Sequence, residues 1–179
     1  EEILYRQKFR EGELEGAYKD TNTEKEWKTK TRAQALITGL EPNPNIENGT
    51  EYIQIFLEKE TNTTNTWKIR TNNKTLKNIS TDGYQGNIYL TNNKTKLNKT
   101  HPQITPNQII ENKTMQLNNT GETIKLYKNN KIRDQVAYGN QNTTRNWNIT
   151  IKPKETAYRK KTNNIYQDTN TEEDWETGK

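Results

Sequence analysis

Residues 117–138 constrain the fold of this chain most. A polar Asn-Asn-Thr-Gly turn is followed by a segment in which Ile124 and Leu126 alternate with polar or aromatic residues. That two-residue period is typical of a half-buried β-strand. A second turn at Asn129-Asn130 leads into a returning segment, Ile132 to Tyr138. The stretch therefore predicts a β-hairpin.

Short runs with the same alternation recur through the middle of the chain, which predicts about seven to nine short strands. No stripe of apolar residues with the helical period extends over as much as three turns. The almost wholly polar residues 91–103 are expected to form a long loop. Buried positions are expected at Ile53, Ile55, Leu57, Trp67 and Ile69. Further strands are expected at 33–40 (ended by Pro42 and Pro44), 52–57, 67–70, 88–90 and 147–151 (ended by Pro153), with shorter candidates starting at Ile79 and at 108–110 and 115–117.

The polar composition agrees with an all-β chain rich in turns. The sequence contains 28 Thr, which favours strands, and 26 Asn, which favours tight turns. Codon bias in an AT-rich genome is an equally good explanation of the Asn excess. A mean hydropathy of -1.34 would by itself suggest disorder. The modest net charge of +5 and the clustering of apolar residues into alternating runs argue for a thin folded core instead.

Composition also limits the sites and the location that the chain can have. There is no cysteine, so disulfides and thiolate metal sites are excluded. No apolar run approaches the roughly 18 residues of a membrane span, so membrane insertion is not expected. The chain begins with Glu1 and no Met, and we expect it to be a fragment of a longer protein.

The two ends of the chain resemble each other. Tyr5-Arg6 and a later Asp-Thr-Asn-Thr-Glu segment ending at Trp27 recur as Tyr158-Arg159 and the same segment ending at Trp175. We therefore expect a tandem array, with residues 1–32 ending a preceding unit, 33–153 forming a sandwich and 154–179 ending this unit. The alternative is that both end segments dock on the same central domain.

A set of motifs occurs in order along the chain: Leu36 to Pro44, Glu51-Tyr52-Ile53-Gln54-Ile55, Trp67-Lys68-Ile69, Leu117 to Leu126, Asp134 to Tyr138, and Arg159 through Asp168-Thr169-Asn170. In this order they resemble the lamin tail domain family, in the prokaryotic type of this intermediate-filament tail. The resemblance implies an immunoglobulin-like antiparallel β-sandwich with irregular N- and C-terminal flanks, and a non-enzymatic interaction or anchoring module. Thr66 stands where the family usually has Gly, and residues 71–110 do not align.

Catalytic patterns are weak. A Ser-His-Asp triad needs an oriented imidazole, and the one His, His101, lies in the polar region beside Pro102, where we expect a solvated loop residue. The one Ser is Ser80, and the carboxylates Glu172 and Asp174 lie in a charged tail. No phosphate-binding glycine loop occurs. The sequence therefore does not predict an enzyme, and no cofactor is expected.

Calcium is the metal that the sequence suggests best. Oxygen-bearing side chains recur at alternate positions in both end segments, as they do in calcium loops. The position for the loop glycine holds Lys25 or Glu173, which departs from that pattern. We favour the alternative of a capped helical turn with its Trp packed on the sandwich. The candidate ligands are Asp20, Asn22, Glu24, Asp168, Asn170 and Glu172.

Ten Asn-x-Ser/Thr sequons occur, more than the composition explains by chance. They indicate glycosylated surface loops if the chain is exported. The alternative is that Asn-Lys-Thr is a favoured loop tripeptide. The candidate residues are Asn48, Asn62, Asn73, Asn78, Asn93, Asn98, Asn112, Asn118, Asn142 and Asn148.

Basic residues gather in two stretches that would suit nucleic acid. With 23 acidic residues against 28 basic ones, and no aromatics at stacking spacing, we favour a solvated basic face. The stretches hold Lys125, Lys128, Lys131 and Arg133 along the hairpin, and five basic residues from Lys152 to Lys161.

Taken together, these patterns favour a structural or adhesive module of an extracellular or cell-surface repeat protein, with other domains or proteins as partners. The alternative is an accessory domain fused to an enzyme such as a nuclease, contacting nucleic acid or envelope.

Overall fold

The structure, a computed structural model, describes residues 2–6, 27–31, 35–44, 50–58, 66–71, 74–80, 85–141, 149–168 and 171–178. They belong to two compact units, Glu1–Ala33 and Gln34–Lys179. In the first unit, β1 (Glu2–Arg6) and β2 (Trp27–Thr31) form a two-stranded antiparallel sheet.

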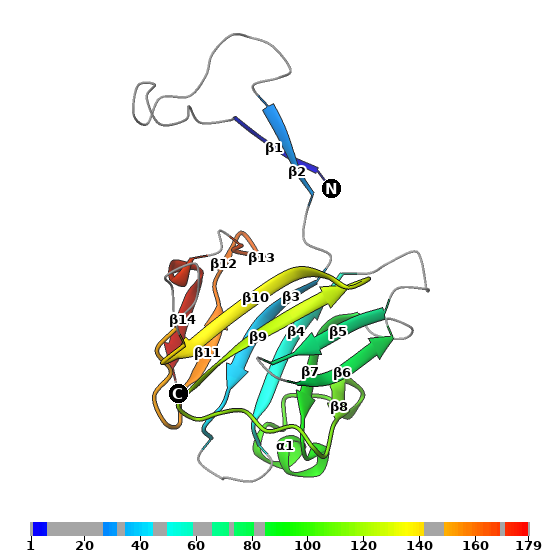
Figure 1. The fold of residues 1–179 in the computed structure, drawn as a ribbon, viewed down its shortest axis with the longest axis vertical. Helices are drawn as coiled ribbons and strands as arrows, with labels where there is room; N and C mark the ends of the chain where they lie inside the picture. The colour runs from blue at the N-terminus through cyan, green and yellow to red at the C-terminus, as the bar shows by residue number, and fades with distance from the viewer. Residues whose placement is uncertain are drawn as a thin grey trace. The chain divides into compact units, whose positions relative to one another are not determined.

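The second unit is built mainly from two sheets, with one α-helix among its described residues, so the expected all-β sandwich class is confirmed. The larger sheet has six strands in the order β14-β11-β3-β4-β7-β8, and the smaller has four in the order β10-β9-β5-β6. In Figure 1 the smaller sheet lies in front of the larger one. The larger sheet comprises β3 (Ala35–Glu41), β4 (Tyr52–Leu57), β7 (Gly86–Thr91), β8 (Ile109–Glu111), β11 (Thr156–Arg159) and β14 (Trp175–Gly178), and the smaller comprises β5 (Thr66–Arg70), β6 (Thr75–Ser80), β9 (Gly121–Lys128) and β10 (Lys131–Gly139).

A single apolar cluster fills the space between the two sheets. Alternate residues of β4 and β9 enter it, such as Ile53 and Ile55 from the larger sheet and Ile124 and Leu126 from the smaller. All four are fully buried. In β5, Ile69 is fully buried and Trp67 is 1% exposed. The inward positions predicted from the period-two alternation are confirmed, but β4 is also buried at Tyr52 and Gln54 on its other face.

The predicted hairpin is confirmed as β9 and β10. Its turn residues Asn129 and Asn130 both have positive φ, 50° and 62°, which Asn tolerates and which a two-residue hairpin turn requires. A register shift between Ile132 and Asp134 bends β10 near the turn.

The region 91–103 was expected to be a loop, and this was wrong. Residues Lys94–Thr100 form helix α1, in which the Asn93 side chain accepts a hydrogen bond from the Lys96 amide (2.9 Å) as the N-cap. The helix is anchored by one fully buried residue, Leu97, which packs in a second cluster with Tyr52. One apolar residue in two turns leaves no periodic signal.

Three other expectations need correction. Ile79 lies near the end of its strand, β6, and does not start it. Residues 115–117 form no strand, although Met115 and Leu117 are buried in the core. Strand β8 pairs with β7 in parallel, which differs from the all-antiparallel sandwich expected.

The C-terminal segment is part of the larger sheet. Strand β11 pairs with β3 on one side and with β14 on the other. Between them lie a small two-stranded sheet, β12 (Lys161–Thr162) with β13 (Ile165–Tyr166), and a 3₁₀ turn, η3 (Glu172–Asp174). The sequence-based division placed 154–179 outside the sandwich, whereas the structure places its strands inside one unit with residues 34–153.

Candidate functional site

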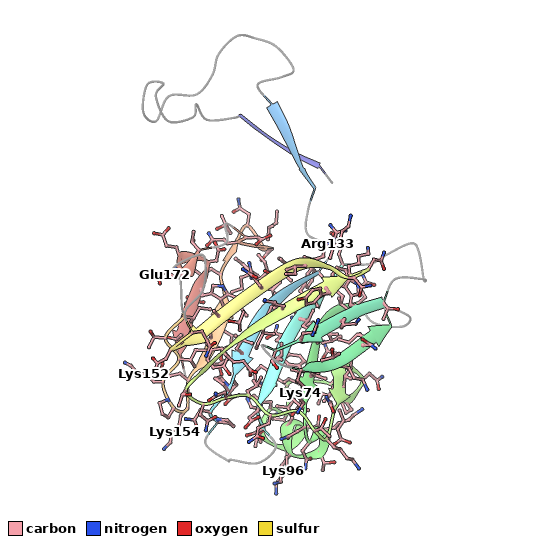
Figure 2. All side chains as sticks on the ribbon, viewed as in Figure 1. Lys74, Lys96, Arg133, Lys152, Lys154 and Glu172 are labelled. Carbon is pink, nitrogen blue, oxygen red and sulfur yellow. The ribbon has the colours of Figure 1, made fainter. Side chains whose placement is uncertain are left out.

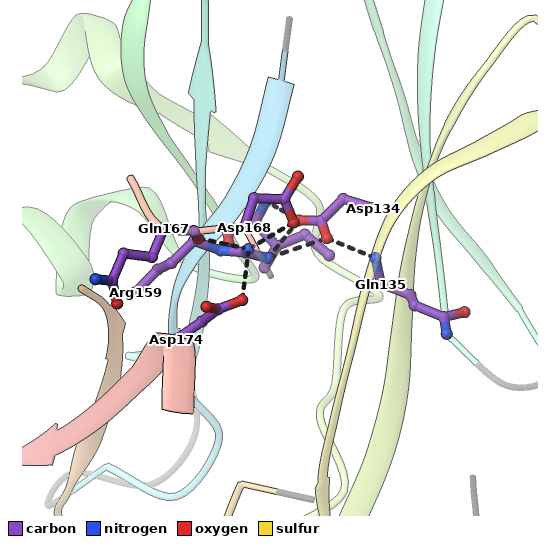
Figure 3. Close-up of polar contacts among 7 residues, drawn as sticks. Asp134, Gln135, Arg159, Gln167, Asp168 and Asp174 are labelled. Atoms are coloured by element: carbon purple, nitrogen blue, oxygen red, sulfur yellow. Dashed lines mark hydrogen bonds and ion pairs between the residues drawn. The ribbon is translucent and has the colours of Figure 1, made fainter. Parts of the chain in front are cut away.

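The most unusual feature of the described residues is a buried arginine, Arg159 at the end of β11 (Figure 3). Its Nη2 donates to both carboxylate oxygens of Asp134, at 3.0 and 2.8 Å. Its Nε donates to the Ile37 carbonyl at 2.9 Å, and its Nη1 donates to Asp168 Oδ1 at 3.1 Å. The guanidinium carbon lies 4.9 Å from the centre of the Trp175 ring. We call these side chains, with Asp174, the Arg159 cluster.

The members of the Arg159 cluster come from several parts of the fold. Asp134 lies on β10 of the smaller sheet, and its Oδ2 also accepts a hydrogen bond from the Ile37 amide of β3 at 2.7 Å. Asp168 and Asp174 lie in the segment that joins β11 to β14, with Asp174 Oδ2 3.9 Å from Arg159 Nη1. The cluster therefore joins the two sheets and the C-terminal segment at one point.

The surroundings of Asp134 in the Arg159 cluster shift the pKa of its carboxyl. Burial raises the pKa of this carboxyl from 3.8 to about 6, and the nearby Asp168 also raises it. The Arg159 guanidinium and the hydrogen bonds from the Ile37 and Gln135 amides lower it but only partly offset the burial. Asp134 is therefore an ion-pair partner whose charge is costly to bury.

A second set of contacts joins the other end of the sandwich. Glu51 Oε2 accepts the Leu117 amide at 3.0 Å, and the Tyr138 hydroxyl donates to the Asn118 carbonyl at 2.9 Å. Beside them is a pocket of about 520 Å³, and the described residues that line it include Glu51, Lys74 and Glu122 but no Ser, Cys or His. Burial raises the pKa of Glu122, against hydrogen bonds and Lys74, which lower it. The pocket therefore offers polar and charged side chains to a ligand.

His101 was expected to be a solvated loop residue, and this was wrong. It is half-buried as the C-cap of α1, and its ring lies edge-on to Tyr52 with centroids 5.5 Å apart. Its Nε2 lies 3.3 Å from Glu41 Oε2, and its Nδ1 lies 2.9 Å from the Thr100 hydroxyl oxygen. The histidine thus joins the helix to the larger sheet.

The proposed calcium ligands fall only partly within the described residues. Asp20, Asn22, Glu24 and Asn170 lie outside them. Asp168 is bound to Arg159, and Glu172 is exposed in η3. No group of three or more His, Cys, Asp or Glu side chains is placed to hold a metal in the part of the chain that the structure describes.

The alternative for this segment was a capped helical turn with the Trp packed on the sandwich. The turn is η3, whose N-cap position is Thr171, without a side-chain cap hydrogen bond. The packing of Trp175 in the core is confirmed.

The sequons differ in their surroundings. Asn78 and Asn118 are exposed, and Asn93 and Asn98 are half-buried at the cap and in the body of α1. The Asn112 side-chain nitrogen donates to the Leu76 carbonyl, and its oxygen accepts from the Thr114 amide at 3.2 Å. The remaining candidates, Asn48, Asn62, Asn73, Asn142 and Asn148, lie outside the described residues.

The two basic stretches do not form one surface. Lys128 and Arg159 are buried, with the Lys128 ammonium 5.3 Å from the Trp67 ring centre. Arg133 and Lys152 lie well apart in Figure 2. A different basic surface exists on the outward face of the smaller sheet. In register across β5 and β9, Lys68 is paired with Tyr127, and Arg70 with Lys125.

We call Lys68, Arg70, Lys125 and Tyr127 the outer basic face. The Arg70 guanidinium lies 5.8 Å from the Tyr127 ring centre. The described outward positions of β5, β6, β9 and β10 include no Asp or Glu. Sequence reasoning missed this face because two of its cations lie on β5, far from the hairpin in sequence.

The hairpins at the two ends of the chain have matching registers. In β11 and β14, Arg159 is opposite Trp175 and Tyr158 is opposite Glu176. In β1 and β2, Arg6 is opposite Trp27 and Tyr5 is opposite Lys28. The sequence similarity therefore extends to the pairing of the strands.

Comparisons with protein-family models, curated proteins and solved structures found no match to this chain. None of the helices in the described part of the chain is long and apolar enough to cross a membrane.

Proposed function

We propose that this chain is a non-catalytic structural and interaction module, one unit of a larger repeat protein at the cell surface. The observation that carries the proposal is the matching pairing of the two end hairpins, Arg6 with Trp27 and Arg159 with Trp175. A closing hairpin that occurs twice, once near each end of the chain, is what a tandem array produces. Exposed sequons such as Asn78 would then face the outside of the cell.

The use of charge within the fold supports a structural role. The Arg159 guanidinium directs its donors to acceptors inside the fold. Buried charges that are paired in this way hold elements of the fold together.

Contacts between the quoted motifs support an immunoglobulin-like sandwich of the lamin tail type. Residues from separate motifs meet as Glu51 with Leu117 and as Asp134 with Arg159. The chain also crosses between the sheets from β4 to β5, β6 to β7, β8 to β9 and β10 to β11, as Greek-key sandwiches do.

Surface proteolysis of intact cells tests the cell-surface proposal. Cells that produce the full-length protein are treated with trypsin, and the released peptides are identified by mass spectrometry. We expect peptides from residues 34–179 in the supernatant, with a cytoplasmic protein as the negative control. Release of these peptides only after lysis would contradict the proposal.

The outer basic face favours a second candidate function, an accessory domain that contacts nucleic acid. The face holds three cations around one tyrosine, and its described outward positions include no acidic residue. The cations could contact a phosphate backbone, and the tyrosine ring could stack on a base. Non-specific DNA binding is measured over a salt series with the chain and with the variant Lys68→Gln/Arg70→Gln/Lys125→Gln. We expect the variant to lower the slope of log affinity against log salt by about 2 to 3, because each phosphate that a side chain neutralises adds roughly one unit to that slope.

The matched control removes three exposed cations elsewhere, as Lys113→Gln/Lys152→Gln/Lys154→Gln. Net charge is the same in the two variants. Equal weakening by both, or no DNA binding by the parent chain, would reject the outer basic face as a nucleic-acid site.

A further inference from the structure

We propose that residues 3–30 are the closing hairpin of a preceding sandwich in the same polypeptide, and that Arg6 fills in that sandwich the place that Arg159 fills in this one. The inference rests on the proposed repeat architecture. It also names the partner of the N-terminal segment, which is a preceding copy of the sandwich. It starts from the register, which places Arg6 opposite Trp27 as Arg159 is opposite Trp175.

The spacing of the side chains that surround Arg159 is also kept. Seven positions lead from Asp168 to Trp175, and seven lead from Asp20 to Trp27. In this unit, Asp168 binds the guanidinium and Trp175 lies against it. The path from Arg to Asp is longer at the N-terminal end, 14 positions against nine. Lengthening the connection between two strands costs little in free energy.

Strand pairing indicates what the N-terminal hairpin lacks. Strand β11 is held on both sides, by β14 and by β3, with Tyr158 opposite Gly39. Strand β1 belongs to a two-stranded sheet, so among the described residues it pairs with β2 alone. An isolated two-stranded hairpin is marginal in water, and a third strand gives it stability. The missing neighbour is a strand of the β3 kind from another sandwich.

A preceding copy of this sandwich would also supply the charge that Arg6 needs. In this unit the partners of the arginine are the Asp134 carboxylate of β10 and the Ile37 carbonyl of β3. One position differs in size, because Leu4 stands at the register position of Ala157, which is fully buried opposite Leu40. The substitution Leu4→Ala removes that difference.

A fusion protein with residues 3–179 as its C-terminal part tests the proposal. Residues 34–155 are placed directly ahead of Ile3, so that residues 3–30 follow a first sandwich as residues 156–178 follow the second. Hydrogen exchange is read on peptides from 3–31, which occur once in the fusion. We expect at least tenfold slower exchange of β1 and β2 amides than in the intact chain, because the new third strand stabilises them.

Three variants make the result specific. Arg6→Met in the fusion should reverse the protection at least tenfold, and Arg6→Met in the intact chain should leave exchange of these peptides unchanged. Leu4→Ala in the fusion should keep or increase the protection. The proposal would be overturned if residues 3–31 exchanged as fast as in the intact chain in both fusions, the parent fusion and the one with Leu4→Ala.

Protection already present in the intact chain would also overturn it, because the hairpin would then be docked on its own sandwich or on a second copy. Dependence of that protection on protein concentration distinguishes these two occupants. The surface-proteolysis experiment is independent of these measurements, so failure of the hairpin proposal and failure of the cell-surface proposal give different results.

Discussion

Arg159 brings five N–H donors into the interior, and the structure surrounds them with acceptors. Both oxygens of the Asp134 carboxylate accept from Nη2, while the Ile37 carbonyl accepts from Nε and the Gln167 carbonyl from Nη1. Asp168 adds a second carboxylate. Such a complete set of partners offsets the cost of removing the charge from water, which an arginine with one partner could not do.

The raised pKa of Asp134 predicts how stability depends on pH. The folded chain holds the proton up to about pH 6, whereas the unfolded chain releases it near pH 4. The folded state therefore binds more protons in this window, and the contribution of Asp134 to stability is full below pH 4 and falls as pH rises to 6. The fall should be about 3 kcal/mol, from roughly two pKa units at 1.36 kcal/mol each.

Urea unfolding at pH 4, 5, 6 and 7 measures this dependence. Asp134→Asn cannot titrate, so the difference in unfolding free energy between parent and variant isolates the contribution of Asp134. We expect the unfolding free energy of the parent to exceed that of the variant by the largest amount at pH 4 and by the smallest at pH 6–7, after the parent has lost that contribution. A difference that is constant between pH 4 and 7 would contradict the raised pKa.

The environments of the sequons predict which can be glycosylated. Expression in a secretory host should modify Asn78 and Asn118, which are exposed, and leave Asn112 unmodified. Glycan is attached to the side-chain nitrogen, and in Asn112 that nitrogen donates to the Leu76 carbonyl. Glycopeptide mass spectrometry gives the occupancy at each site. Full occupancy at Asn112 in the folded protein would contradict the structure.

At the scale of elements, the β9–β10 hairpin is held at both ends by its backbone. The Asn129-Asn130 turn sets one end, and Gly121 opposite Gly139 sets the other, with φ of 138° and 67°. A Cβ on Gly139 would overlap the Thr120 carbonyl oxygen and the Gly121 Cα. The glycine pair therefore allows the two strands to approach where the chain leaves the hairpin.

Gly139→Ala should lower the unfolding free energy by more than about 2 kcal/mol, from the strained φ and the backbone overlap together. Gly178→Ala is the matched control, because nothing lies within 4 Å of a Cβ at that position. We expect the control to change stability by less than about 0.5 kcal/mol. Equal effects in chemical denaturation would show that Gly139 is not a close-approach position.

Elements with strong period-two alternation were predictable from sequence, and elements held by other forces were not. Strands β4 and β5, and Ile124 and Leu126 in β9, show Ile, Leu or Trp at alternate positions, and the inner faces follow from that pattern. Helix α1 depends on the Asn93 cap and on Leu97 alone. A short strand was indicated at 108–110, where β8 lies, but its parallel pairing with β7 is not encoded in the local sequence.

At the scale of the whole molecule, the second unit is closed by contacts between residues far apart in sequence. Arg159 lies 25 residues from Asp134 and 122 from Ile37 along the chain. The sequence predicts strands at the positions of Ile37 and Asp134 and shows Arg159 in a tail motif, but nothing local indicates that these residues meet. The residues of the cluster were thus identifiable as motif positions, and their joint role followed only from the packing of the two sheets.

The unfolding free energy of Arg159→Met, measured in urea at pH 7 beside the exposed-site control Lys152→Met, tests most directly whether the Arg159 cluster closes the sandwich. We predict a loss of about 3–5 kcal/mol for Arg159→Met, because Asp134 is left buried without its partner, and a change within about 0.5 kcal/mol for the control. The double variant Asp134→Leu/Arg159→Met should recover part of the loss. An Arg159→Met chain as stable as the control would contradict the account.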